Sequence, residues 1–156
     1  MTSAHQFLNP EDHRDLKVHA AAGAAFGDAV SGALTVPAEF RRLACDYPIL
    51  FRYDSAQRQF TSLALFGFEE NENLFLVDDH WDAACRPLSM AVQPFLVGRP
   101  RDGQGPSQVH VDISHPRIAG ADEPVAHAVF DSEGRRDGVA VLFESAVFKN
   151  SNIRST

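Results

Sequence analysis

The run from Val36 to Val77 constrains the fold more than any other part of this chain, because turn residues divide it into short apolar segments. Pro37 stands where proline is best tolerated, at the first position of a helix. The apolar residues that follow recur at the spacing of one helix face, namely Phe40, Leu43, Ala44 and Tyr47. The spacing predicts a helix over 37–47 that ends before Pro48.

Three aromatic-rich segments follow this helix. The segments 49–54, 60–69 and the one that begins at Leu74 are rich in Phe, Leu, Ile and Val and are separated by the polar linkers SAQRQ and ENEN. Short polar linkers between consecutive strands favour an antiparallel meander. We therefore expect an α+β fold that is mainly an antiparallel sheet, with the one short helix packed on a face of it.

The flanking regions add further expected elements. Residues 1–35 are rich in small residues and predict an extended N-terminal arm, with a helical turn at Asn9 and Pro10 and a strand at the sequence GALTV. Beyond the central run, residues 88–98 predict a fourth strand. Pro94 within it indicates an edge position or a bulge, because proline cannot donate a ladder hydrogen bond.

The later part of the chain alternates between loop and strand signals. The stretch 98–107 is rich in glycine and proline and predicts a projecting loop. Residues 107–114 alternate in strand fashion, with Val109, Val111 and Ile113 on one face and His110 and Asp112 on the other. The tail, 125–156, contains two more short apolar runs.

Composition limits the class of protein. A length of 156 residues predicts a single domain over 1–156, and twelve Phe predict a core built from apolar rings. The net charge of −7, with scattered basic residues, argues against a nucleic-acid partner. The chain has neither a signal-peptide pattern nor an apolar stretch of about 18 residues, so we expect a cytoplasmic protein without a transmembrane segment. Cys45 and Cys85 lie forty residues apart and cannot form a zinc site by themselves.

The sharpest chemical candidate is the triplet His110, Val111 and Asp112. Two residues apart on a strand, His110 and Asp112 leave the same face, which is the spacing of a His-x-Asp pair in a non-haem iron site. His127 or His115 would supply the third ligand, and the cofactor would be iron or another divalent metal. The alternative interpretation is a solvated polar strand face, with His115 and Pro116 in a turn.

Two acidic segments have weaker chemical interpretations. The segment 78–82, DDHWD, offers carboxylates for a hard cation but is more typical of an exposed turn with Trp81 packed inward. The segment 69–73, EENEN, predicts a solvated hairpin loop. No nucleophile elbow and no phosphate-binding loop occurs in the sequence, so we assign no catalytic residue.

An ordered set of motifs resembles the bacterial SapC family, which is named for a protein associated with the surface layer. Over residues 8–120 these motifs are PAEF, YPILF, GFEENENLFL, WD, QPFLVG and DISHPR. The resemblance implies no established biochemical activity and no catalytic residues. It also implies a longer C-terminal part in other members, so we expect residues 121–156 to be divergent or shortened.

Three functions follow from these observations. The leading hypothesis is a non-enzymatic SapC-like protein, associated with a bacterial surface layer or envelope process, that binds a protein partner or itself. The alternative is a non-haem metal enzyme that uses His110, Asp112 and a further histidine. The second alternative is a small ligand-binding or adaptor module with a pocket lined by four side chains, those of Phe51, Phe66, Phe68 and Phe75.

Overall fold

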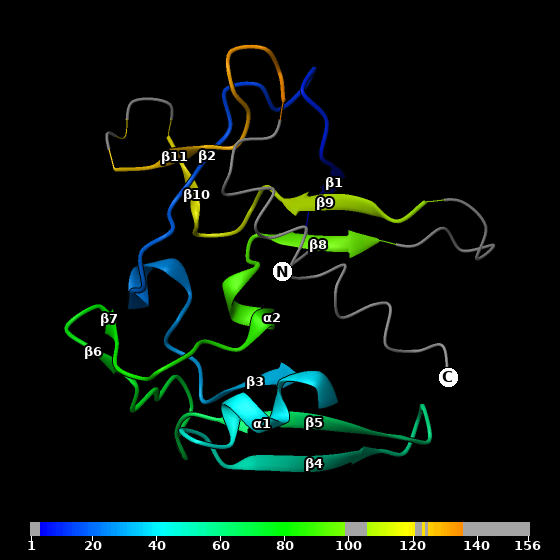
Figure 1. Cartoon of the computed structure of the whole chain (residues 1–156), viewed down its shortest axis with the longest axis vertical. Coiled ribbons are helices and arrows are strands. Elements are labelled where there is room, and N and C mark those ends of the chain that lie inside the picture. The colour runs from blue at the N-terminus through cyan, green and yellow to red at the C-terminus, as the bar shows by residue number, and fades with distance from the viewer. Residues whose placement is uncertain (1–3, 99–105, 121–122, 124, 136–156) are drawn as a thin grey trace. The chain divides into compact units, whose positions relative to one another are not determined.

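The computed structural model describes residues 4–98, 106–120, 123 and 125–135, which form two compact units (Figure 1). The first unit contains the described residues up to Ala20 and those from Val92 onward, and the second contains Ala21–Ala91. Of the loop predicted at 98–107, residues 99–105 lie outside the described residues, as does the apolar run that begins at 139. The expectation of one domain over residues 1–156 stays a prediction.

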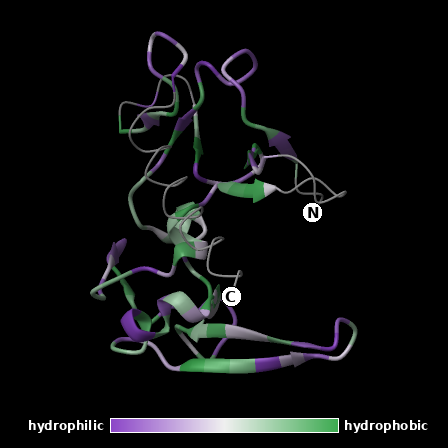
Figure 2. Ribbon diagram, turned by 45° about the vertical axis from the view of Figure 1, so that its right-hand side comes forward, coloured by the Kyte–Doolittle hydropathy of each residue, from purple (hydrophilic) through white to green (hydrophobic). Residues whose placement is uncertain are grey.

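The second unit is built on an antiparallel three-stranded sheet. Strands β4 (Ile49–Asp54) and β5 (Gln59–Leu65) form the predicted hairpin, and β3 (Gly32–Thr35) pairs with the other edge of β5. Figure 2 shows hydrophobic residues along much of this hairpin. The mainly antiparallel α+β fold and the strand at GALTV are confirmed.

The strand that follows the hairpin does not join this sheet as a meander would require. Strand β6 (Leu76–Val77) pairs with β7 (His80–Trp81), and β3 occupies the position beside β5 instead. The chain leaves the sheet after Leu65 because the Glu72 carboxylate accepts the amides of Phe68 and Glu69 at 2.6 and 3.1 Å. These bonds fold residues 68–72 into a turn.

Gly67 makes this turn possible. A Cβ at this position would lie 2.6 Å from the Glu72 carbonyl oxygen, closer than any side chain could approach. The sequence favours a bulge or a close ring contact at Gly67, but the close contact is with Glu72 and not with an aromatic ring.

Two short helical segments pack on this unit. The predicted helix over 37–47 is a 3₁₀ turn, η2 (Pro37–Glu39), followed by α1 (Phe40–Leu43). The second helix, α2 (Leu88–Ala91), occupies residues for which the sequence predicted a strand. The buried Glu39 carboxylate accepts the Leu88 amide at 2.8 Å. A carboxylate at the N-terminus of α2 stabilises the start of the helix, and the pattern of apolar residues in 88–98 does not reveal this contact.

The core of the second unit is aromatic. The Phe66 ring meets the Trp81 and Tyr47 rings edge-on, with centroids 5.3 and 5.2 Å apart. Trp81 Nε1 donates to the Tyr47 hydroxyl at 2.7 Å, and that hydroxyl donates to the Cys85 carbonyl at 2.5 Å. The other buried members are Ala33, Leu43, Ala64 and Met90. The inward packing predicted for Trp81 is confirmed.

The first unit contains two small antiparallel sheets. In one, β9 (Gln108–Asp112) lies between β1 (His5–Phe7) and β8 (Phe95–Gly98). In the other, β2 (Lys17–Val18) lies between β10 (Ile118–Ala119) and β11 (His127–Ala128). Their shared core contains Leu8, Val18, Phe95, Val109, Val111, Val129 and Phe130.

The N-terminal region is more structured than an extended arm. It supplies β1 and β2 to the first unit, and η1 (Ala24–Phe26) and β3 to the second. At its start the Asn9 side chain accepts the Asp12 amide at 2.8 Å and the Asn9 carbonyl accepts the His13 amide at 3.2 Å, which confirms the predicted helical turn. Pro94 directly precedes β8, which is an edge strand as its proline indicated.

Replacing Phe66 with alanine should lower the free energy of unfolding of the second unit by about 3–5 kcal/mol, because it leaves a cavity among packed rings. Phe66 is 1% exposed, whereas Phe68, two residues away, is 86% exposed. Phe68→Ala is therefore the matched control and should cost less than about 0.5 kcal/mol. Urea unfolding monitored by Trp81 fluorescence measures both, and equal losses would contradict the aromatic core described above.

Alkaline pH should weaken the second unit through Tyr47. Burial raises the pKa of Tyr47 to about 12, against the lowering effect of the hydrogen bond from Trp81. The unfolded chain ionises at the ordinary tyrosine value near 10, so this contribution to stability is complete below 10 and is lost as pH rises through about 12. Urea midpoints across this range should fall in the wild type.

Two variants test this assignment. Tyr47→Phe has no hydroxyl to ionise at this position and should lose less stability across the same alkaline range. Tyr53→Phe removes a hydroxyl from an exposed position and should behave like the wild type. Parallel alkaline curves for all three proteins would contradict the role given to Tyr47.

Candidate functional site

Strand β9 places the predicted pair of metal ligands on one face. Val109 and Val111 are buried in the core of the first unit, and His110 and Asp112 alternate with them on the opposite face. The predicted strand and its alternation are therefore confirmed over Gln108–Asp112, whereas Ile113, expected on the face of Val109 and Val111, follows the end of β9 and is 38% exposed. What each polar side chain contacts decides what this face can do.

His110 is packed between neighbouring strands. It lies opposite Phe7 on β1 and Leu96 on β8, and its ring meets the Phe7 ring at a centroid distance of 6.1 Å. A Cβ at Gly98 would lie 2.8 Å from the imidazole, so the absence of a side chain at Gly98 leaves room for this ring. The His110 imidazole is thus positioned by packing against its neighbours on the sheet, Phe7 and Gly98.

Asp112 stabilises the turn that follows β9. Its carboxylate accepts the Ser114 hydroxyl at 2.6 Å and the Ser114 amide at 3.0 Å. The Ser114 hydroxyl contributes most to holding the pKa of Asp112 below its ordinary value. This carboxylate already has hydrogen-bond donors and needs no metal to be satisfied.

The motif DISHPR continues as a second turn. His115 Nδ1 accepts the Arg117 amide at 3.1 Å, and the His115 carbonyl accepts the Ile118 amide at 2.9 Å. Arg117 is buried and donates to the His19 carbonyl at 3.0 Å. The expectation that His115 and Pro116 form a turn is confirmed, and one ring nitrogen of His115 is occupied by that turn.

The structure does not bring His127 to the same face. His127 lies on β11, opposite Val18, in a different sheet from β9. Among the described residues, no three His, Cys, Asp or Glu side chains are grouped closely enough to hold a metal ion. A metal role for His110, Asp112 and His127 stays a prediction, which elemental analysis of the wild type and of a His110→Ala, Asp112→Ala variant would test.

Sequence reasoning missed His5 as a neighbour of this pair. His5 lies directly opposite Asp112 in the register of β1 with β9. This contact could not be found in the sequence, because β1 has three residues and one hundred residues separate it from β9. The polar side chains brought together here are therefore those of His5 and Asp112, with His110 beside them on β9.

The two acidic segments are turns with structural roles. Asp78 and Asp79 have φ of 49° and 58° and form the two-residue turn of the β6–β7 hairpin, as the turn interpretation predicted. Asp79 also accepts the Ala24 amide at 3.1 Å. In the segment 69–73, Asn73 donates to the Asp28 carbonyl at 2.8 Å, so this loop is anchored as well as solvated.

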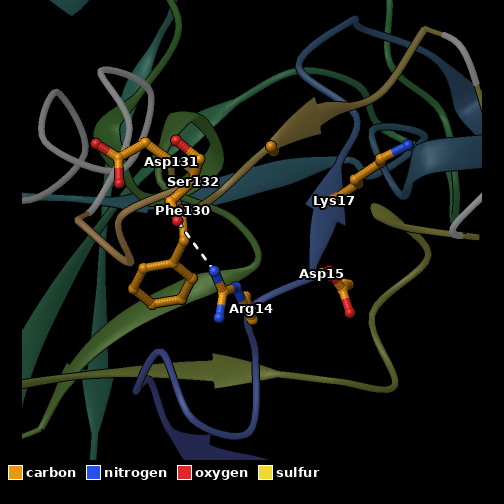
Figure 3. A pocket seen from close by; sticks show the side chains of 7 residues that line it. Arg14, Asp15, Lys17, Phe130, Asp131 and Ser132 are labelled. Atoms are coloured by element: carbon orange, nitrogen blue, oxygen red, sulfur yellow. Dashed lines mark hydrogen bonds between the residues drawn. The ribbon is translucent and has the colours of Figure 1, made fainter.

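The first unit also has an open hollow of about 380 Å³ (Figure 3). The Arg14 side chain lines this hollow, and its guanidinium donates a hydrogen bond to the Ser132 carbonyl at 3.0 Å. The lining carries charges of both signs, from Arg14, Asp15, Lys17 and Asp131. The Asp131 carboxylate already accepts hydrogen bonds from the Arg135 main-chain N–H and from the Arg135 side chain. The hydrogen bond from the main-chain N–H contributes most to lowering the pKa of Asp131.

The four phenylalanines proposed to line a ligand pocket do not lie together in one. Phe66 and Phe75 belong to the packed aromatic core, whereas Phe51 and Phe68 are exposed. The hollow beside Arg14 contains none of the four. This geometry counts against the pocket that the ligand-binding alternative requires.

These observations define a strand-rich α+β protein whose polar motif residues form turns and strand contacts. The chain belongs to the SapC family, since the model of that family matches residues 8–140. The match continues past residue 120, where the recognisable motifs stop. No curated protein and no solved structure matches the chain. Within the described ranges, no helix is long and apolar enough to cross a membrane.

Replacing Ser114 with alanine should raise the pKa of Asp112 toward the ordinary aspartate value. The carboxylate contributes to stability above that value, near 3.9, and the contribution is lost as pH falls through the lower folded pKa. The variant should lose less than about 1 kcal/mol at neutral pH, because the pair is partly exposed, and should approach the wild type in acid.

Carbon-13 NMR titration of the aspartate carboxyl groups measures this pKa directly. Ser132→Ala, in another turn of the same unit, is the control and should leave Asp112 unchanged. An Asp112 pKa that is the same in Ser114→Ala and in the wild type would show that Ser114 is not its cause.

Proposed function

We propose that this protein is a non-enzymatic member of the SapC family that associates with a bacterial surface layer or envelope process by binding protein. Membership of the family carries the proposal, because the family is named for a surface-layer-associated protein. The local bonding of the DISHPR motif also supports it. Asp112, Ser114 and His115 are engaged with one another and with the backbone of their own turns.

The surface of the second unit supports a protein partner. Several large apolar side chains of this unit are exposed, including Leu34, Leu50, Phe51, Tyr53, Phe60 and Phe68. Leu34 and Leu50 flank Leu63 on one face of the sheet, and Tyr53 and Phe60 pair on the other face. Clustered exposed apolar side chains of this kind are typical of interaction sites. The net charge of −7 supports the further proposal that nucleic acid is not the partner.

Where the protein works is part of the same proposal. We propose the cytoplasm as one location. The name of the family supports the surface layer as a second location. In both places the proposed role is association with a protein assembly rather than catalysis.

Co-sedimentation with cell-envelope fragments of the encoding bacterium tests this proposal. We expect the purified protein to sediment with fragments that carry their surface protein layer, and to remain in solution with fragments stripped of that layer by guanidinium chloride. An unrelated acidic protein of similar size controls for trapping. Equal sedimentation with both kinds of fragment, or with neither, would contradict the proposal.

A further inference from the structure

Strand β4 has an open edge in the described structure. It is the outer strand of the order β3-β5-β4, and within the described ranges no strand pairs with its other side. The Pro48 carbonyl accepts the Leu65 amide at 3.0 Å. Every second residue of an antiparallel strand bonds to the same partner strand, so the backbone groups of Leu50, Arg52 and Asp54 also face β5. The N–H and C=O groups of Ile49, Phe51 and Tyr53 therefore point outward.

This edge lacks some of the features that usually prevent edge pairing. β4 has six residues, and contains no proline and no lysine. The other edge strands of this sheet and of the β1-β9-β8 sheet have three or four residues, in β1, β3 and β8, and a proline directly precedes both β8 and β4. β4 is thus the longest of these edges.

One face of the hairpin carries an uncovered pair of rings. Tyr53 lies opposite Phe60, with ring centroids 5.0 Å apart, yet the two residues are 53% and 69% exposed. Nearer the core, the Phe51 ring is covered in part by Phe40 of α1, at a centroid distance of 5.8 Å. Phe51 is still 62% exposed, so the exposed apolar rings on this face extend from Phe51 to the Tyr53 end of β4.

We infer that β4 pairs with β4 of a second copy of this chain, antiparallel and about a two-fold axis at Tyr53. The charges of the strand select this register. A two-fold axis at Arg52 would place the two Arg52 side chains opposite each other, which is unfavourable. An axis at Tyr53 places each Arg52 opposite Asp54 of the second copy, so the two ion pairs are equivalent by symmetry.

The same register satisfies the backbone and the exposed rings. The outward N–H and C=O of Tyr53 would bond to those of Tyr53 in the second copy, which is the pairing made by a hydrogen-bonded antiparallel site. On the ring-bearing face the order across the joined sheet becomes Phe60, Tyr53, and then Tyr53 and Phe60 of the second copy. An axis at Phe51 would instead place Arg52 opposite Leu50 of the second copy, so neither ion pair would form.

This interaction surface goes beyond the proposed function and does not depend on it. Analytical ultracentrifugation of the full-length purified protein, from low to high micromolar concentration, measures the self-association. We expect the wild type to dimerise and Arg52→Glu to raise the dimer dissociation constant about tenfold or more, since both symmetric ion pairs become repulsive. High salt should weaken the wild-type dimer.

Arg58→Glu is the matched control. It makes the same charge change in the turn of the same hairpin, away from the proposed interface, and should leave the dissociation constant within about twofold. A wild type that remains monomeric, or equal weakening by Arg52→Glu and Arg58→Glu, would overturn the inference. Circular dichroism confirms that each variant is folded.

Tyr53→Pro tests the backbone of the edge. Its N–H points away from β5, so proline at this position removes a donor from the open edge and none from the β4–β5 ladder. We expect loss of the dimer with the circular dichroism spectrum retained, and a folded Tyr53→Pro that still dimerises would overturn the inference. Envelope co-sedimentation is a separate measurement, so its failure would affect only the proposed surface-layer role.

Discussion

The buried carboxylate of Asp28 holds together the irregular segments of the second unit. Its two oxygens accept the Gly23 amide and the Arg86 guanidinium, each at 2.9 Å, and its main-chain carbonyl accepts the Asn73 side chain. The Arg86 guanidinium also lies 4.9 Å above the centre of the Trp81 ring. A residue with no exposed surface therefore connects four segments that have little regular structure of their own. Removing one partner of such a pair is costly, because the other charge stays buried.

Glu39 is a second buried carboxylate that connects separate segments, in this case β3, α1 and α2. It accepts the Thr35 hydroxyl from β3 and the Leu88 amide of α2, and Arg42 of α1 lies within 3.5 Å of it. Strands of two to seven residues and helices of four leave many backbone groups without a regular partner. Buried carboxylates that accept amides compensate for this, so charged side chains define the fold as much as apolar ones do.

The sequence predicts the elements whose cause is local. The hairpin of β4 and β5, strand β9, the turn at Asn9 and the turn at Asp78 follow from alternation, turn residues or caps that lie within a few positions of each other. The elements that it mispredicts depend on distant residues. Residues 88–91 are helical partly because Glu39, far earlier in the chain, accepts the Leu88 amide. The chain after Gly67 turns away from the sheet because the Glu72 carboxylate accepts the amides of Phe68 and Glu69.

The candidate site divides in the same way. Spacing alone places His110 and Asp112 on one face, and the structure agrees. Spacing cannot show that Ser114 bonds to Asp112, that Gly98 gives room to the His110 ring, or that β1 brings His5 opposite Asp112. These contacts depend on strand partners and on turns whose geometry is set by tertiary structure. A motif read as metal ligands therefore has a second, structural explanation that only the neighbours reveal.

The phenylalanine content illustrates how far composition can be used. The sequence predicts a core of apolar rings, and Phe66, Phe95 and Phe130 are buried in the two cores. Phe51, Phe60 and Phe68 remain exposed on or beside the hairpin, where short helices cover only the end nearest to Phe40. A strand longer than the helix above it must leave apolar rings in water or place them against another molecule. The exposed rings of Phe51 and Tyr53 belong to the strand whose backbone edge is open, so the same few residues provide both reasons for association.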